Sequence, residues 1–281
     1  MPLFNHCRLT FFLTATSLSI TPLFGQSPSP PSYSEVDKDQ IAAALQLTQL
    51  AAAKYEFILD GANAEPLKLL SEPVLRWSNP AAGQVHGNIY LWTSGGRPAV
   101  VGSLFKWFSP HTHMSHEFQS LAEQPLIGKF DGKEVWTSGE PGLRFAALVD
   151  APQPSKGSSQ RLLQMRELAR SCTVSKLERD GTVGELRLLP QPIYRYESPQ
   201  SGTIDGGLFA FVQGTDPDLF LLLEAREIHG NVAWHFAASR MNSVGLSLRF
   251  KGQVIWQADM LPWSDVNGHR MPYTSFRHDK P

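Results

Sequence analysis

An internal repeat constrains the fold of this chain more than any other sequence feature. Residues 67–98 align without a gap against residues 186–217 at a constant offset of 119, and 10 of the 32 aligned pairs are identical. Unrelated segments of ordinary composition would share about two. Most of the remaining pairs keep their chemical character. A duplicated structural unit explains this pattern.

The repeat extends in both directions with slips of a single residue. Upstream, residues 45–51 align with residues 163–169 at offset 118, and downstream, residues 130–136 align with residues 250–256 at offset 120. Loops readily absorb slips of this kind. Each unit then spans about 100 residues, which is an ordinary size for one domain.

Hydrophobic periodicity predicts one helix followed by short strands in each unit. Helices are expected over residues 39–54 and 158–171, with Ser158 or Ser159 as the N-cap of the second. Asp-Gly, Gly-Gly-Arg-Pro and Lys-Gly-Gln between apolar runs are hairpin signals, which favour antiparallel neighbours. The expected strands are residues 55–59, 67–78, 84–93, 99–108, 126–130 and 134–137 in the first unit, and 173–178, 185–197, 207–213, 219–227, 232–239, 244–250 and 254–257 in the second.

The fold class expected from these elements is α+β, with two tandem duplicated units. Each unit is an N-terminal helix packed on an antiparallel sheet of five or six strands, because a sheet with one apolar face needs a cover. The predicted division is a signal peptide at 1–25, a Pro/Ser linker at 26–38, a first unit at 39–150, a linker at 151–159 and a second unit at 160–281. The C-terminal tail is expected to pack on the second unit.

The N-terminal residues have the layout of a secretory signal peptide. His6 and Arg8 precede a mostly apolar run of 12 residues at 9–20, and Gly25 is the expected cleavage position. Such a run is shorter than the about 20 residues that cross a bilayer. A buried N-terminal helix is the alternative. We therefore expect a protein exported to the periplasm or the cell exterior, without a transmembrane segment in its mature chain.

Charge and cysteine content narrow the classes of partner and fold. The formal net charge is −1 with both signs interspersed, which argues against nucleic acid or an anionic membrane as a partner. Removal of the signal would take Cys7 and leave only Cys172, so that no intramolecular disulfide could form. Cys172 follows a predicted helix at the start of a strand, where we expect a buried and inert thiol.

Three segments carry a resemblance to known sequences. Residues 187–198 (RLLPQPIYRYES), 205–226 (DGGLFAFVQGTDPDLFLLLEAR) and 241–244 (MNSV) resemble a family of uncharacterised secreted planctomycete bacterial proteins with no assigned activity. The resemblance extends over most of the mature chain. It implies an exported bacterial protein, and it supplies no catalytic residues.

The sharpest chemical signal is a cluster of three histidines, His111, His113 and His116. His-x-His on an extended segment places both rings on one side, and three imidazoles so close together can reach one metal ion. The stretch is similar to the His-x-His-x-Asp-His motif of the metallo-β-lactamase superfamily, with Ser115 in place of the aspartate and no Gly-rich turn after it. The sequence requires no cofactor, although this cluster could hold a divalent metal such as zinc.

The repeat offers a second interpretation of the same cluster. At offset 119, His116 aligns with His235, whereas Gly230 and Val232 stand at the positions of the two other histidines. A residue present in both copies favours a shared structural role. The metal interpretation and the structural one both remain open at this point.

Two arginines and two tryptophans are candidate ligand contacts. Arg76 and Arg195 are the only charged identities in the aligned window, so they could bind an anionic ligand or lie along the sheet and support it. Trp92 and Trp107 could stack on a ligand in a groove, although aromatic side chains on a sheet are more often packed against it.

Motifs of several enzyme classes are missing from the sequence. It contains no Gly-x-Ser-x-Gly elbow, no Gly-rich phosphate loop, no Cys-x-x-Cys pair and no calcium-loop ladder. The sequence therefore favours a non-catalytic binding or structural module of the periplasm or cell envelope, with a small ligand or an envelope protein as its partner. The alternative is a metal-dependent hydrolase that uses the histidine cluster. No catalytic residue is identified.

Overall fold

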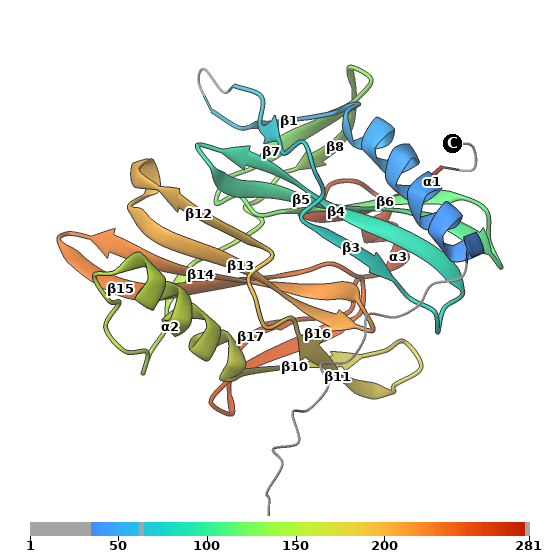
Figure 1. Ribbon diagram of the computed structural model, residues 1–281. Helices are drawn as coiled ribbons and strands as arrows, with labels where there is room; N and C mark the ends of the chain where they lie inside the picture. Colours follow the sequence, from blue (N-terminus) through green and yellow to red (C-terminus); the bar gives the residue numbers. More distant parts are fainter. Residues whose placement is uncertain (1–34, 62–64, 279–281) are drawn as a thin grey trace, which may run out of the picture.

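The computed structural model describes residues 35–61 and 65–278. Strands make up 52% of it and helices 16%, and the strand pairs among the described residues are antiparallel (Figure 1). The expected antiparallel sheets are therefore confirmed, within a protein that is mostly β. None of the described helices combines the length and the apolar character that a membrane crossing requires.

The elements follow one another in two similar series. The first series is α1 (Glu35–Ala52), β1 (Tyr55–Leu59), β2 (Lys68–Leu69), β3 (Leu75–Ser78), β4 (Gln84–Ser94), β5 (Arg97–Ser109), β6 (Met114–Ser120), β7 (Leu126–Phe130), β8 (Lys133–Ser138) and β9 (Ala146–Ala147). The second is α2 (Ser158–Arg170), β10 (Cys172–Leu177), β11 (Val183–Leu188), β12 (Tyr194–Ser198), the short 3-10 helix η1 (Pro199–Ser201), β13 (Thr203–Gln213), β14 (Asp216–Ile228), β15 (Asn231–Arg240), β16 (Gly245–Phe250), β17 (Gln253–Ala258), α3 (Trp263–Val266) and β18 (Tyr273–His278).

The strands form three sheets. A three-stranded sheet has the order β1-β7-β8, and a six-stranded sheet has the order β18-β6-β5-β4-β2 with β3 also paired to β4. The nine-stranded sheet runs β17-β16-β10-β11-β13-β14-β15-β9 with β12 paired to β13, and the eight strands along its path curl into a half-barrel. Strands of the two series pair in the same way, as β3 with β4 and β12 with β13 do.

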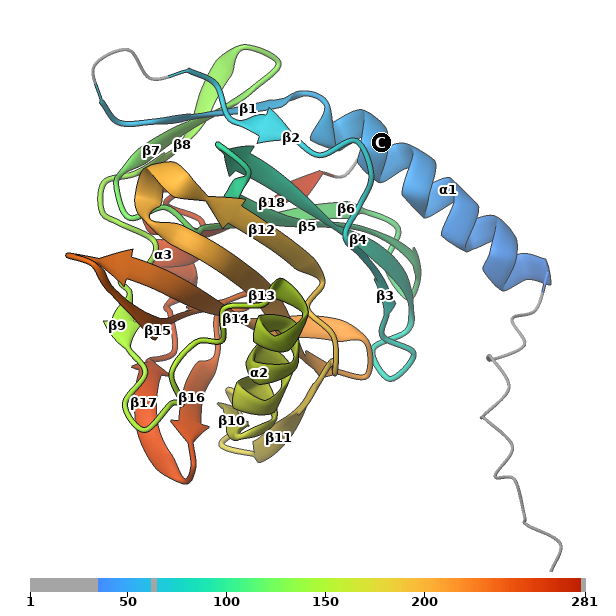
Figure 2. The same cartoon turned by 60° about the vertical axis from the view of Figure 1, so that its left-hand side comes forward.

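The six-stranded and nine-stranded sheets pack face to face around a shared apolar core. Ile89 and Val101 from the first series meet Leu208 and Phe220 from the second in this core. Helix α1 packs on β4 and β5, and α2 packs on β13 and β14, on opposite outer faces (Figures 1 and 2). Because β4, β5, β13 and β14 are buried on both faces, they read as continuous apolar runs and not as alternating ones.

Each outer face has a core of its own, to which the helix contributes only part. On the first side, Phe57 and Trp136 of the three-stranded sheet pack against Trp92 and Phe118 of the six-stranded sheet. On the second side, the curled strands β10 and β16 close over β13 to β15 together with α2. The helix that was expected to cover each sheet therefore shares this task with strands.

Only the beginning of the C-terminal tail contacts the second unit as predicted, where Arg179 lies over the Trp263 ring. Strand β18 pairs along its whole length with β6 of the first series, from Tyr273 opposite Gln119 to His278 opposite Met114. Without β18, β6 would be an edge strand with unpaired backbone groups. The end of the chain therefore completes the sheet of the first half.

Several boundaries also differ from the prediction. The expected strands at 67–78 and 185–197 are each broken in two, because Pro73 in one and Pro190 and Pro192 in the other cannot donate to a ladder. The N-cap of α2 is Gly157, which makes no side-chain cap hydrogen bond, and neither of the expected serines takes this place.

The described residues begin after the predicted signal peptide and within the predicted linker. The expected signal peptide, Cys7 and the expected linker up to residue 34 lie outside the described residues. Helix α1 begins at Glu35, so the last residues assigned to the linker, 35–38, are helical.

Candidate functional site

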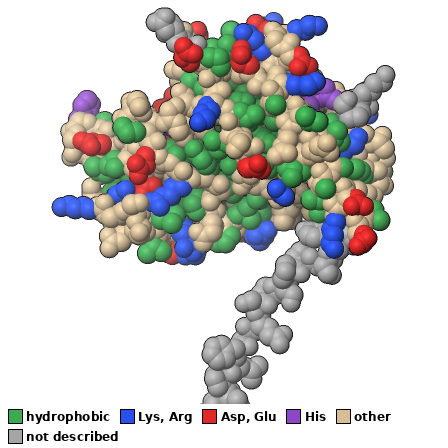
Figure 3. Space-filling view, turned by 45° about the horizontal axis from the view of Figure 1, so that its top comes forward, with side chains coloured by type: hydrophobic (Ala, Val, Ile, Leu, Met, Phe, Trp, Pro, Cys, Tyr) green, Lys and Arg blue, Asp and Glu red, His purple; other side chains and the backbone are tan. Residues whose placement is uncertain are grey.

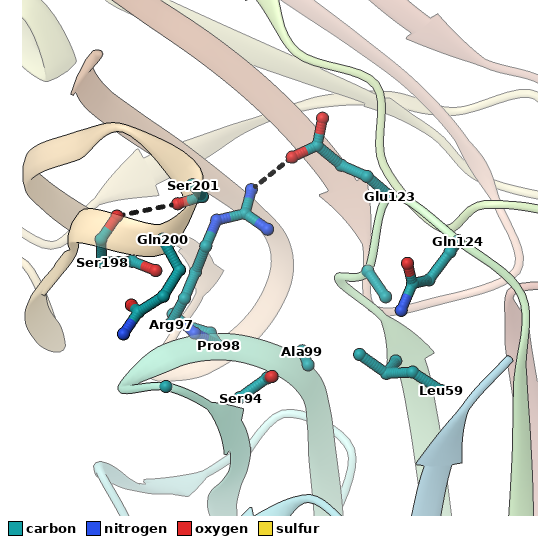
Figure 4. A pocket seen from close by; sticks show the side chains of 12 residues that line it. Leu59, Ser94, Arg97, Pro98, Ala99, Glu123, Gln124, Ser198, Gln200 and Ser201 are labelled. Carbon is teal, nitrogen blue, oxygen red and sulfur yellow. Dashed lines mark hydrogen bonds and ion pairs between the residues drawn. The ribbon is translucent and has the colours of Figure 1, made fainter. Parts of the chain in front are cut away.

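A cavity near the seam of the two large sheets lies between a hairpin of one half and a turn of the other. It has a volume of about 460 Å³. Ser94 and Arg97 from the β4–β5 hairpin line one side, and Ser198, Gln200 and Ser201 from the end of β12 and η1 line the other (Figure 4). We call this space the seam cavity.

A cluster of four charged side chains stands at the wall of the seam cavity. The Arg97 Nε lies 2.9 Å from an oxygen of Glu224, and its Nη2 lies 3.1 Å from Glu123 (Figure 4). Arg226 contacts the same two glutamates at 3.3 and 3.4 Å. Both guanidinium groups also lie over the ring of Phe145, each 4.8 Å from its centre. Two cations and two anions therefore neutralise one another at this wall.

Glu224 is the fully buried member of this cluster. Besides the two arginines, it accepts hydrogen bonds from the Tyr196 hydroxyl at 2.7 Å and from the Thr203 hydroxyl at 3.0 Å. Burial alone would lower the pKa of Arg97, but the neighbouring Glu224 raises it above its ordinary value. Arg97 consequently keeps its charge and has no proton to exchange at neutral pH.

A second polar cluster lies at the other end of the shared core. Asp218 of β14 is held by Lys176 at 3.1 Å and by the Asn242 amide at 2.5 Å. Burial raises the pKa of Glu117 on β6 to about 8, and the charge of Asp218 adds to this effect. Burial also raises the pKa of Asp216, with further contributions from Asp218 and Glu117. Asp218, paired with Lys176, therefore carries the charge that disfavours ionisation of Glu117 and Asp216.

The three predicted metal ligands do not converge. The rings of His111 and His113 lie 5.5 Å apart, next to Trp107 at the β5–β6 hairpin. His116 is buried under the three-stranded sheet, where its Nδ1 lies 3.0 Å from the Tyr55 hydroxyl. Among the described residues, no group of three or more histidine, cysteine, aspartate or glutamate side chains is arranged to hold a metal ion.

His116 is a neutral side chain packed on a second histidine. Its ring centre lies 4.2 Å from that of His278 on β18. Burial, with a smaller contribution from His278, lowers the pKa of His116 to about 3. The strand registers place His116 opposite Leu104 and Phe236 opposite Leu223, so Phe236 and not His235 holds the equivalent position. The alignment at offset 119 misses a one-residue slip in β6.

The two predicted arginines occupy equivalent positions in two ladders, Arg76 in β3–β4 and Arg195 in β12–β13, but their surroundings differ. Arg195 binds the carboxylate of Asp205 with two nitrogens, at 2.8 and 2.6 Å. Arg76 is exposed and lines a separate cavity of about 230 Å³ beneath α1. Arg195 therefore connects β12 to β13 and to the start of α2, whereas Arg76 lines a cavity.

The remaining candidates are packed to different degrees. Trp92 is 1% exposed, with Phe57 and Phe118 against its rings, so neither of its faces is open to a ligand. Trp107 is partly buried beside the hairpin histidines. Cys172 is buried as expected, and burial raises the pKa of its thiol to about 12.

Sequence reasoning missed Arg97, Glu123 and Glu224, although the repeat contained a signal for them. At offset 119, Arg97 aligns with Asp216, and His86 aligns with Asp205. In each pair the charge of the residue differs between two otherwise similar sequences. Arg97 lines the seam cavity, and His86 lines the cavity beneath α1. Comparisons with models of protein families, with curated proteins and with solved structures give no match for this chain.

Proposed function

We propose that this protein is an exported, non-catalytic binding module made of two copies of one helix-and-sheet unit, and that it binds a small uncharged polar ligand in the seam cavity. Export is supported by the signal-peptide layout of residues 1–25 and by the resemblance to secreted planctomycete proteins. The periplasm or the cell exterior is the proposed location. The surface in Figure 3 mixes basic with acidic side chains, in keeping with a partner that is not selected by net charge.

Equivalent details in the two series support the proposed duplication. Leu75 pairs with Ile89, and Tyr194 pairs with Leu208, at the same offset of 119. The β7–β8 and β16–β17 turns each have two successive residues with positive φ, 49° and 76° in the first, and 49° and 83° in the second. The shared register of the β3–β4 and β12–β13 ladders is the stronger support, because turns with two positive φ values are common in hairpins and also occur at β14–β15.

The observation that carries the proposed function is the internally neutralised wall of the seam cavity. A charged ligand would have to compete with the ion pairs of Arg97, and separating Arg97 from the fully buried Glu224 is costly. The hydroxyls of Ser94 and Ser201 and the amide of Gln200 can instead donate and accept hydrogen bonds without any change in charge. The cavity therefore suits an uncharged ligand with several hydroxyl or amide groups.

The same observation argues against catalysis at the seam. The charged lining residues, Arg97 and Glu123, are bonded to each other. General acid–base chemistry needs a group that can give or take a proton near the working pH. A metal-dependent hydrolase is also unsupported, because the Nδ1 of His116 is bonded to the Tyr55 hydroxyl and no group of three metal-ligating side chains converges among the described residues.

A binding screen with matched variants tests the proposal. Neutral mono- and disaccharides and amino-acid amides would be screened by ligand-observed NMR against the protein, against Gln200→Ala and against Gln191→Ala. Both glutamines are exposed, but only Gln200 lines the seam cavity. Loss of one hydrogen bond should raise the Kd about three- to tenfold in Gln200→Ala only. Equal binding by both variants, or no binding of any compound, would contradict the proposal.

A further inference from the structure

The second half contains a buried carboxylate that is held by two arginines. Asp205 is 1% exposed and accepts from Arg195 at 2.8 and 2.6 Å and from the Nε of Arg161 on α2 at 2.9 Å. Arg195 also donates to the backbone oxygen of Ser158, in the first turn of α2. The carboxylate therefore satisfies the planar fork of Arg195 and fixes the start of the helix to the sheet.

The first half keeps the arginine of this arrangement and lacks the carboxylate. Arg76 lies opposite Asn88 in the β3–β4 ladder, just as Arg195 lies opposite Gly207 in the β12–β13 ladder. His86 stands at the position of Asp205. At offset 118, Ala43 stands at the position of Arg161, so the second arginine is missing as well.

A cavity occupies the place of the missing groups. It has a volume of about 230 Å³, and Ile41, Arg76, Ser78, His86, Asn88 and Thr215 contribute to its lining. Its lining comes from α1, β3 and β4 and from the tip of the β13–β14 hairpin. Within residues 35–61 and 65–278, none of the ion pairs includes Arg76. We call this space the α1 cavity.

We propose that the α1 cavity binds the carboxylate of a ligand, which would take the place in the first half that the Asp205 side chain takes in the second. The Arg76 guanidinium supplies two parallel donors, a geometry that fits a carboxylate better than a point-charge acceptor. This inference does not rest on the seam cavity, and either site can exist without the other.

The neighbours of Arg76 fit a single bound carboxylate. Burial lowers the pKa of His86, with Asp37 of α1 opposing this effect, so the imidazole is mainly neutral at pH 7 and can donate one hydrogen bond. Asp37 is not among the residues that line the cavity. The Asn88 amide nitrogen donates to the Thr48 hydroxyl at 2.9 Å. Asn88 therefore supports the cavity wall, and Arg76 and His86 are the donors available to the ligand.

The carboxylate could come from a free organic acid or from the C-terminus of a peptide, and matched probes separate these sources. Propionate and N-acetyl-Ala-Ala would be titrated by NMR at pH 7, and the uncharged amide of each acid would be titrated as its control. A charge-assisted pair at Arg76 should favour each bound acid over its amide by about tenfold or more. Binding of propionate alone identifies a small-acid site, and tighter binding of the peptide acid identifies a C-terminus site.

Two substitutions and a control locate the effect. Arg76→Met should remove the preference for the acid, whereas Arg144→Met, at another exposed arginine, should leave it unchanged. His86→Asp should place an internal carboxylate beside Arg76, as in the second half, and abolish binding while the protein stays folded by circular dichroism. Equal binding of acids and amides, an unchanged preference in Arg76→Met, or no binding of either acid at millimolar concentration would overturn the proposal.

Discussion

Replacement of Glu117 by glutamine should remove a large part of the pH dependence of stability between pH 5 and pH 8. Glu117 is partly buried on β6, on the side that faces the second half. Its pKa is raised from an ordinary value of 4.5 to about 8, mainly by burial, with a smaller contribution from the charge of Asp218 and an opposing one from the hydrogen bond with Tyr273. The folded protein therefore keeps this carboxyl protonated at pH values at which the unfolded chain has released the proton.

The direction and the magnitude follow from proton linkage. Between pH 4.5 and pH 8 the folded state binds more protons at Glu117 than the unfolded state, so stability falls as the pH rises. Each unit of difference in pKa corresponds to about 1.4 kcal/mol, so the full effect is about 5 kcal/mol, and most of it is lost between pH 5 and pH 8. Relaxation of the partly open edge makes this an upper bound.

Urea unfolding at pH 5, 6, 7 and 8 measures the effect directly. The Glu117→Gln protein keeps a polar side chain beside Tyr273 but has no proton to lose, so its free energy of unfolding should exceed that of the unsubstituted protein increasingly as the pH rises. Glu185→Gln, at an exposed glutamate of β11, is the matched control and should run parallel to the unsubstituted protein. Parallel curves for Glu117→Gln as well would refute the reasoning.

Three further predictions concern buried polar groups. Burial and the neighbouring His278 keep His116 neutral in the folded protein, so the free energy of unfolding should fall as the pH drops below 6.5. His116→Phe should reduce this fall in urea unfolding from pH 7 to pH 4, and an unchanged fall would contradict the prediction. Glu224→Gln should destabilise the protein by about 3 kcal/mol because it leaves buried arginines uncompensated, and a loss no larger than that of the exposed Glu227→Gln would speak against the cluster. Cys172 should react with a disulfide reagent at pH 8 only after unfolding, and rapid labelling of the native protein would disprove its burial.

Local patterns in the sequence predicted the local parts of the fold well. Strands were expected at residues 55–59 and 126–130, and β1 and β7 have these bounds. The expected long strand at 67–78 failed at Pro73, where apolar periodicity continues although the ladder cannot. Strand β6 was not among the expected strands, because the polar residues Ser115, His116 and Glu117 give its sequence no apolar run, although an extended segment was expected at the histidines.

Long-range pairing could not be predicted from the same patterns. Nothing in the residues near Tyr273 indicates that they pair with Gln119, because any exposed edge could accept a strand of this composition. The seam cavity depends on Arg97 and Glu224, which lie far apart in the sequence and meet only when the two sheets stack. The sequence could have indicated these places only through the aligned pairs in which a charge changes, such as Arg97 with Asp216.

The contact between the halves shows why those pairs mark sites. Each long hairpin ends on the other half: Thr215 at the tip of β13–β14 exchanges hydrogen bonds of 2.8 Å with the backbone of Ser78, and the Tyr194 hydroxyl donates to Gly96 at the tip of β4–β5, at 3.0 Å. Arg97 follows Gly96 at one end of the seam between the sheets, and Asp216 follows Thr215 at the other end. Because these ends lie apart, different side chains can stand at each without disturbing the shared apolar core. Arg97 lines the neutralised seam cavity at one end, and Asp216 belongs to a cluster of carboxyls with raised pKa values at the other, so the two ends of the seam differ in charge and in the ligands that they can accept.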